Sequence, residues 1–141
     1  MVLLGWCIAV ALLAIAALHF FWAWGGRWGG VAAIPQRDGA PLFTPGRTVT
    51  LFMSLLFLLA ACILLIRSGA VPWPFSSTPP RLVQWGSWTI AVLFLLRAAG
   101  DFRDVGFFKR VRNGRFALLD DRLYSPLALV IAIGSAFIAK G

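Results

Sequence analysis

The sequence predicts an all-α membrane protein, a bundle of four transmembrane helices that forms a single domain over residues 1–141. The first observation is the composition: 60% of the residues are hydrophobic and 13% are charged, whereas soluble domains carry about 25% charged residues. The second is a mean hydropathy of +0.86. The third is that the apolar residues form four runs, each long enough to cross about 30 Å of hydrocarbon. A soluble fold would leave much of this apolar surface in water, so a bilayer is the expected solvent.

The four predicted spans cover about residues 2–24, 48–66, 83–99 and 123–139. At about 1.5 Å of rise per residue, the last two are close to the shortest length that crosses a bilayer. We expect the first run to be a true span rather than a cleaved leader, because no Lys or Arg precedes it and it is longer than the apolar part of a signal peptide. The prolines between Pro72 and Pro80 exclude a helix there and predict an ordered linker.

The distribution of basic residues predicts how the bundle is oriented. Of the 13 Lys and Arg residues, all but Arg67, Arg81 and Lys140 lie in or beside the loops that follow the first and third spans. By the positive-inside rule, both basic loops are expected in the cytoplasm and both termini outside, as in a multi-pass protein of a bacterial inner membrane. A net charge of +8 would suggest nucleic acid as the partner of a soluble protein. Here no basic face separate from the membrane remains to bind it.

The two halves of the chain are similar when one is shifted by 75 residues, the spacing from Gly25 to Gly100. The shift lays the first span on the third and the second on the fourth. It overlays two glycine pairs and two arginine pairs: Gly25 with Gly100, Gly39 with Gly114, Arg37 with Arg112 and Arg47 with Arg122. We therefore predict two parallel helical-hairpin repeats related by an axis along the membrane normal. Chance similarity is the alternative.

Each basic loop also carries a strong turn signal. The dipeptides Asp38-Gly39 and Asn113-Gly114 suit the two central positions of a type I′ turn, which needs positive φ at both. We expect one or two short β-hairpins that cap the cytoplasmic end of the bundle. Residues 107–112 and 115–118 are the expected arms of the second one.

Few residues inside the spans are able to carry chemistry. His19 is the only histidine, and an ionisable residue at membrane depth suggests ligand or proton binding, with a neutral structural imidazole as the alternative. One histidine makes neither a bis-histidine haem site nor a zinc site, and no cofactor or metal is predicted. Tyr124 is expected as an interfacial anchor or as a donor to a ligand. Cys7 and Cys62 lie at similar depth and are expected as small core residues rather than as a disulfide.

The polar residues at the inner ends of the spans predict a mainly cationic basin. Arg97 and Asp101 are four residues apart, so they are expected to pair on one helix face. Such a basin suits an anionic lipid headgroup, an isoprenoid pyrophosphate or a carboxylate, whereas snorkelling and salt bridges between loops are the structural alternative. The candidate ligand-binding residues are His19, Trp22, Arg27, Arg47, Arg97, Asp101, Arg103, Lys109, Arg122 and Tyr124.

Several short stretches together carry a family resemblance. They are residues 95–103, 106–110, 116–117, 120 and 122–127, with His19, Trp22 and residues 25–29 near the start. With these residues the chain resembles a bacterial family of small four-pass membrane proteins that is known only as a domain of unknown function. The resemblance covers nearly the whole chain and implies the fold and the residues to watch, without an activity. The family pattern leads us to expect an aromatic residue at the position of Asp104, so that acid is a departure from it.

Three functions remain open at this point. The first is a protein that binds an anionic lipid or small amphiphile at its cytoplasmic mouth, without catalysis. The second is an accessory subunit of a larger membrane complex, whose apolar helix faces pack on other subunits or on a second copy. The third is a small membrane enzyme that acts on lipid or isoprenoid headgroups through His19, Asp101 and Tyr124.

Overall fold

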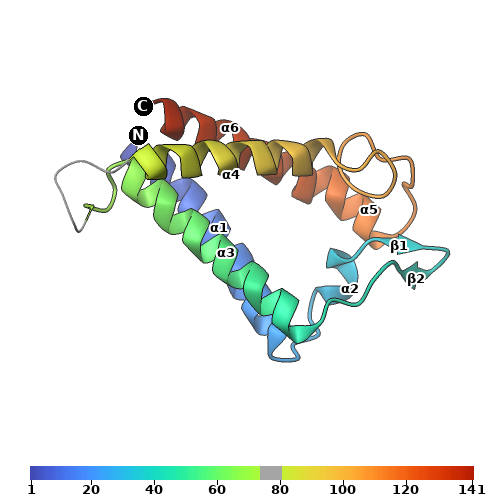
Figure 1. Ribbon diagram of the computed structural model, residues 1–141. Coiled ribbons are helices and arrows are strands. Elements are labelled where there is room, and N and C mark those ends of the chain that lie inside the picture. The colour runs from blue at the N-terminus through green and yellow to red at the C-terminus, as the bar shows by residue number, and fades with distance from the viewer. Residues whose placement is uncertain (74–80) are drawn as a thin grey trace.

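A computed structural model describes residues 1–73 and 81–141 (Figure 1). Four of its helices are long and apolar enough to cross a membrane, which confirms the predicted fold class. Most of the linker expected between Pro72 and Pro80 lies outside the described residues. The long helices are α1 (Val2–Ala23), α3 (Arg47–Arg67), α4 (Arg81–Ala99) and a continuous segment over Arg115–Lys140 that comprises α5 (Arg115–Leu119), the π-helical turn η1 (Asp120–Tyr124) and α6 (Ser125–Lys140).

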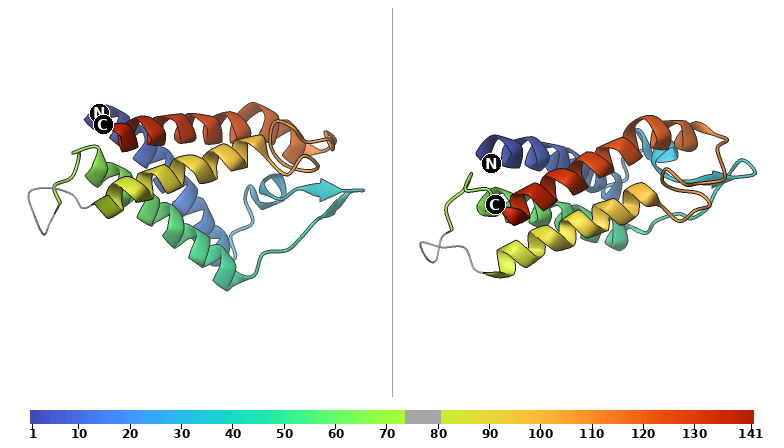
Figure 2. Two further views of the ribbon diagram at one scale, coloured as in Figure 1. Left: turned by 45° about the horizontal axis from the view of Figure 1, so that its top comes forward. Right: turned by 90° about the horizontal axis from the view of Figure 1, so that it is seen from above.

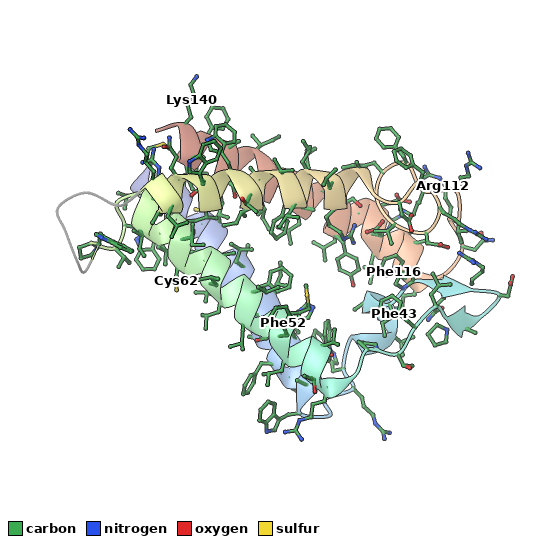
Figure 3. The ribbon with its side chains drawn as sticks, in the orientation of Figure 1. Phe43, Phe52, Cys62, Arg112, Phe116 and Lys140 are labelled. Atoms are coloured by element: carbon green, nitrogen blue, oxygen red, sulfur yellow. The ribbon has the colours of Figure 1, made fainter. Side chains whose placement is uncertain are left out.

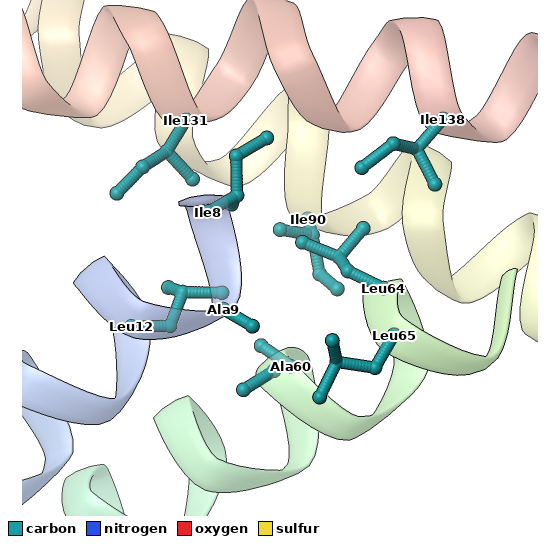
Figure 4. Close-up of a cluster of buried hydrophobic side chains, with 10 residues drawn as sticks. Ile8, Ala9, Leu12, Ala60, Leu64, Leu65, Ile90, Ile131 and Ile138 are labelled. Atoms are coloured by element: carbon teal, nitrogen blue, oxygen red, sulfur yellow. The ribbon is translucent and has the colours of Figure 1, made fainter. Parts of the chain in front are cut away.

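The long helices pack as two hairpins, α1 with α3 and α4 with α6. The hairpins meet at the end that holds both chain termini and diverge toward the opposite end (Figures 1 and 2). We call these the termini end and the basic end. The basic end holds loop one (residues 24–46) and loop two (residues 100–114). The core that joins the hairpins lies toward the termini end and includes Ile8, Ala9, Leu12, Ala60, Leu64, Leu65, Ile90, Ile131 and Ile138 (Figure 4).

Small residues let the helices approach closely near the termini end. A Cβ added at Gly5 of α1 would lie 2.1 Å from the Ser68 hydroxyl just after α3, and one at Gly134 of α6 would lie 2.3 Å from Ile8. Close backbone approach of this kind is how helices associate in lipid, where no hydrophobic force brings them together. The expectation that Cys7 and Cys62 are core residues is wrong, because both are exposed free thiols on the outer faces of their helices.

The fourth long helix begins earlier than predicted, at Arg115 instead of residue 123. The charges of residues 115–122 ended the predicted apolar run, but two of them, Asp120 and Asp121, are neutralised by basic partners elsewhere in the fold. The helix also continues through Pro126, the second residue of α6. In η1 the Ser125 N–H bonds to the Asp120 carbonyl, five residues earlier. A proline lacks the N–H for an ordinary helical bond and its ring crowds the preceding turn, and the wider π turn accommodates both effects.

Loop one contains the predicted β-hairpin. Helix α2 (Gly30–Ala33) is followed by strands β1 (Gln36–Arg37) and β2 (Ala40–Pro41), which pair antiparallel. The turn residues Asp38 and Gly39 have φ of +54° and +80°, the left-handed conformation that the Asp-Gly signal predicts.

The second β-hairpin, expected at Asn113-Gly114, does not form. Residues 100–114 contain no strand, and Arg115, an expected strand residue, begins α5. The N–H groups that a hairpin would have paired across strands bond elsewhere. The N–H groups of Phe107 and Phe108 donate to the carbonyls of Ala98 and Ala99 at the end of α4.

The proposed internal repeat stays a prediction. The overlaid glycines all have positive φ: 89° at Gly25 and 88° at Gly100, 80° at Gly39 and 97° at Gly114. Their surroundings differ, because Gly39 closes the hairpin of loop one whereas Gly114 precedes α5.

Candidate functional site

Asp120 is the centre of a buried charged cluster where α4, loop two and η1 meet. Its Oδ1 accepts a hydrogen bond from Arg97 of α4 at 2.7 Å, and its Oδ2 accepts from the Gly106 N–H at 2.8 Å and the Lys109 ammonium at 3.1 Å. The side chains of Asp120 and Lys109 are both 0% exposed. Charges buried this completely are tolerated only when they are paired and hydrogen-bonded. The cluster therefore ties loop two and the fourth helix to α4.

Lys109 has three acceptors, which match the three N–H donors of an ammonium group. Besides Asp120, it donates to the Gly106 carbonyl at 3.2 Å and to Asp121. Asp121 in turn accepts from the exposed Arg112 at 3.3 Å, and Figure 3 shows Arg112 at the basic end. Lys109 was a candidate ligand-binding residue, but in the structure it is a buried structural cation.

Asp101 holds the first turn of loop two together. Its Oδ1 accepts from the N–H groups of Arg103, Asp104 and Val105 at 2.9, 2.7 and 2.9 Å. Desolvation raises the pKa of Asp101, but the three donors together lower it by more, so the pKa lies below its ordinary value of 3.8. The predicted Arg97–Asp101 pair is wrong. Helix α4 ends just before Gly100, which has φ of +88°. Asp101 therefore lies outside the helix, and its four-residue spacing from Arg97 no longer places the two side chains on one helix face.

Two contacts connect loop one to the α4–α6 hairpin across the basic end. Arg37 pairs with Asp104 of loop two at 2.5 Å, and the Tyr124 hydroxyl donates to the Ala32 carbonyl of α2 at 3.1 Å. Asp104, the departure from the family pattern, is only 7% exposed. Its ion pair with Arg37 gives this buried acid a structural role. Tyr124 acts as a tether rather than as an isolated interfacial anchor.

His19 lies on α1 in a mainly apolar setting. Its Nδ1 is 2.9 Å from the Ile15 carbonyl one turn earlier, and its ring packs against Trp22 and Phe57 with centroid separations of 5.2 and 5.0 Å. The Trp22 indole donates to the Trp28 carbonyl at 2.8 Å. These contacts account for the positions of His19 and Trp22 without a ligand.

The three residues proposed for an enzyme make separate contacts. His19 contacts its own helix and two aromatic rings, Asp101 bonds within its own loop, and Tyr124 bonds to α2 and packs on Phe116. None of the contacts described for one of these side chains joins it to another. The structure therefore supplies no shared catalytic centre built from them.

The remaining cations of the basic end are exposed. Within the described part of the chain, none of them forms an ion pair, and they are Arg27, Arg47, Arg103, Arg110, Arg115 and Arg122. Because the hairpins diverge (Figure 1), these cations form two groups instead of the single basin expected from the sequence. Arg27 and Arg47 lie at the end of the first hairpin, where Arg47 stacks over the Trp24 ring at 4.6 Å. The other four lie on loop two and the helix that follows.

Arg103 and Arg110 are neighbours within the second group. The Arg103 carbonyl accepts hydrogen bonds from the N–H groups of Arg110 and Val111 at 3.0 and 2.8 Å, so the two cationic residues are adjacent across the loop. The nearby acids have other roles: Asp101 binds three N–H groups and Asp104 binds Arg37. Two neighbouring cations that form no ion pair within the described residues give this part of loop two a positive potential that attracts anions.

Sequence reasoning missed the acids that organise the site. Asp104, Asp120 and Asp121 were absent from the candidate residues, although each pairs with a cation. A signal was present: all five acids of the chain lie beside the basic loops, and two of them directly precede the fourth apolar run. Away from this end, a shallow apolar hollow of about 290 Å³ on α4, between Trp85 and Leu93, contains no charged residue.

Comparison with known proteins places the chain in a family without assigning an activity. The model of a family described as "Protein of unknown function (DUF3995)" matches residues 12–135, which is most of the chain. No curated protein and no solved structure matches it. An activity therefore has to be inferred from the site itself.

Proposed function

Because the chain belongs to this family of proteins of unknown function, we propose its function from the site alone: the basic end of the α4–α6 hairpin binds the phosphate of an anionic membrane lipid. The observation that carries the proposal is that Arg103 and Arg110 are exposed, have neighbouring backbones and form no ion pair with any described residue, in the loop that follows a membrane-length helix. A guanidinium presents two parallel donors to a phosphate. On this proposal the acids of the cluster neutralise the buried cations and leave the exposed ones for lipid.

The orientation belongs to the same proposal. By the positive-inside rule we place the basic end in the cytoplasmic leaflet of an inner membrane and both termini on the other side. Anionic lipids give that leaflet a negative surface potential, and each arginine near it contributes about 1 kcal/mol of attraction. Removing two arginines should therefore weaken retention of an anionic lipid by about 2 kcal/mol, or roughly 30-fold.

Native mass spectrometry of the protein extracted in mild detergent tests the proposal. We expect the wild type to retain phosphatidylglycerol in preference to phosphatidylcholine, and the double variant Arg103→Gln/Arg110→Gln to lose that preference. Arg81→Gln is the matched control, because Arg81 is also exposed but lies at the termini end. Equal retention by wild type and double variant would contradict the proposal. Co-purification of an unrelated subunit without lipid would favour the accessory-subunit alternative.

A further inference from the structure

Loop two exposes two stacked phenylalanine rings. Phe102 and Phe108 are 61% and 63% exposed, and their ring centroids lie 5.9 Å apart with 23° between the planes. Burying a phenylalanine side chain is worth about 1.5–3 kcal/mol. An outward-facing pair therefore indicates contact with an apolar phase outside the protein.

The backbone of the loop holds the pair in place. Phe102 has φ of +62°, a left-handed conformation that costs an ordinary side chain about 1–2 kcal/mol. The surrounding bonds enforce it: the Asp101 carboxylate accepts from the N–H groups of the next turn, and the Asp101 N–H donates to the Val105 carbonyl at 3.2 Å. A backbone so constrained, with its ring pointing out of the fold, is more consistent with presenting that ring than with burying it.

The depth of the rings follows from the loop's contacts with α4. The N–H groups of Phe107 and Phe108 donate to the carbonyls of Ala98 and Ala99 at 2.8 and 3.4 Å, so the loop folds back beside the last turn of the helix. Helix α4 has 19 residues and is about 28 Å long, close to the hydrocarbon thickness of about 30 Å. In a membrane-spanning α4, the stack lies where the hydrocarbon meets the headgroups.

We propose that loop two is a membrane-insertion element whose Phe102–Phe108 stack enters the bilayer at the boundary between headgroups and acyl chains. The flanking Arg103 and Arg110 stay at headgroup level, the arrangement of apolar and cationic groups found in interfacial segments. The inference rests on the proposed function only in placing loop two at the membrane surface. The rings need no anionic headgroup, so insertion is expected in neutral lipid as well.

Nitroxide depth measurements test the insertion in vesicles of phosphatidylcholine. In a Cys7→Ser/Cys62→Ala background, single labels are attached through Phe102→Cys, Phe108→Cys and, as a control, Asp38→Cys at the exposed tip of loop one. We expect the labels at 102 and 108 to be more accessible to oxygen than to a water-soluble nickel chelate, and the label at 38 to show the reverse. Greater accessibility of either loop-two label to nickel overturns the inference.

A second variant tests the role of the Phe102 ring without straining the loop. Phe102→Gly suits the positive φ, so the loop is retained while the ring is lost. The label at 108 should then shift toward water, and an unchanged ratio of oxygen to nickel accessibility would contradict a role for Phe102. Lost lipid preference with inserted labels rejects the proposed function alone, whereas aqueous labels with intact lipid preference reject the insertion alone.

Discussion

Replacing Asp120 by alanine tests whether the buried charged cluster holds the α4–α6 hairpin together. The substitution removes the acceptor of three donors. Among the described residues it leaves the Lys109 ammonium, which is 0% exposed, with Asp121 as its one remaining carboxylate partner. Removing one partner from a buried ion pair costs about 3–5 kcal/mol. Arg97 is 36% exposed and can turn toward the headgroups, so the loss should arise mainly at Lys109 and the Gly106 N–H.

Equilibrium unfolding in mixed micelles with increasing dodecyl sulfate measures this loss as a free energy. We expect Asp120→Ala to lower the free energy of unfolding by about 3–5 kcal/mol. The control is Asp38→Asn, which removes an exposed charge but keeps a residue type that tolerates the positive φ of this turn, and it should change the free energy of unfolding by less than about 0.5 kcal/mol. Adding Lys109→Met to Asp120→Ala should recover part of the loss, because the stranded buried cation is gone. A loss below about 1 kcal/mol, or a further loss on adding Lys109→Met, would refute the reasoning.

Three further predictions concern the two loops and use the same unfolding measurement. In a double-mutant cycle, Arg37→Ala and Asp104→Ala should show a coupling of about 1 kcal/mol, since the pair joins loop one to the second hairpin; additive losses would contradict that link. The pKa of Asp101 is lower in the folded chain than its unfolded value of 3.8, so its stabilising contribution is full above that pH and is lost as the pH falls through the folded pKa. The stability difference between wild type and Asp101→Asn should shrink in that acid range, and a difference independent of pH would exclude the carboxylate as its source. Gly100→Ala should cost clearly more than Gly25→Ala, because the two glycines share a φ near +88° but only the Cβ at 100 meets a backbone oxygen, at 1.7 Å; equal losses would mean that the close approach is unimportant.

The four helices could be predicted because hydropathy and length are local properties of the chain. The spans expected at residues 2–24, 48–66 and 83–99 agree closely with α1, α3 and α4. The start of the fourth helix could not be predicted in this way, because four of the eight residues 115–122 are charged. Asp120 becomes compatible with a buried helix only through Arg97 and Lys109, which reach it from other parts of the fold.

The sequence predicted a candidate site at the basic end of the molecule, but it did not predict which residues pair there. Spacing alone favoured Asp101 as the partner of Arg97, whereas the helix ends at Gly100 and the true partner is 23 residues away. The Arg37–Asp104 pair joins residues 67 positions apart, and no local pattern indicates it. The divergence of the two helical hairpins depends on how their side chains pack near the termini end. The division of the exposed cations into two groups therefore could not be predicted from the sequence pattern either.

A structure of the protein in nanodiscs that contain phosphatidylglycerol would test the central claim most directly. The proposed function predicts density for a lipid phosphate against the guanidinium groups of Arg103 and Arg110, outside the cluster around Asp120. Lipid phosphate found only at the termini end, near Arg67 and Arg81, or a salt bridge from Arg103 and Arg110 to protein carboxylates in place of lipid, would contradict it.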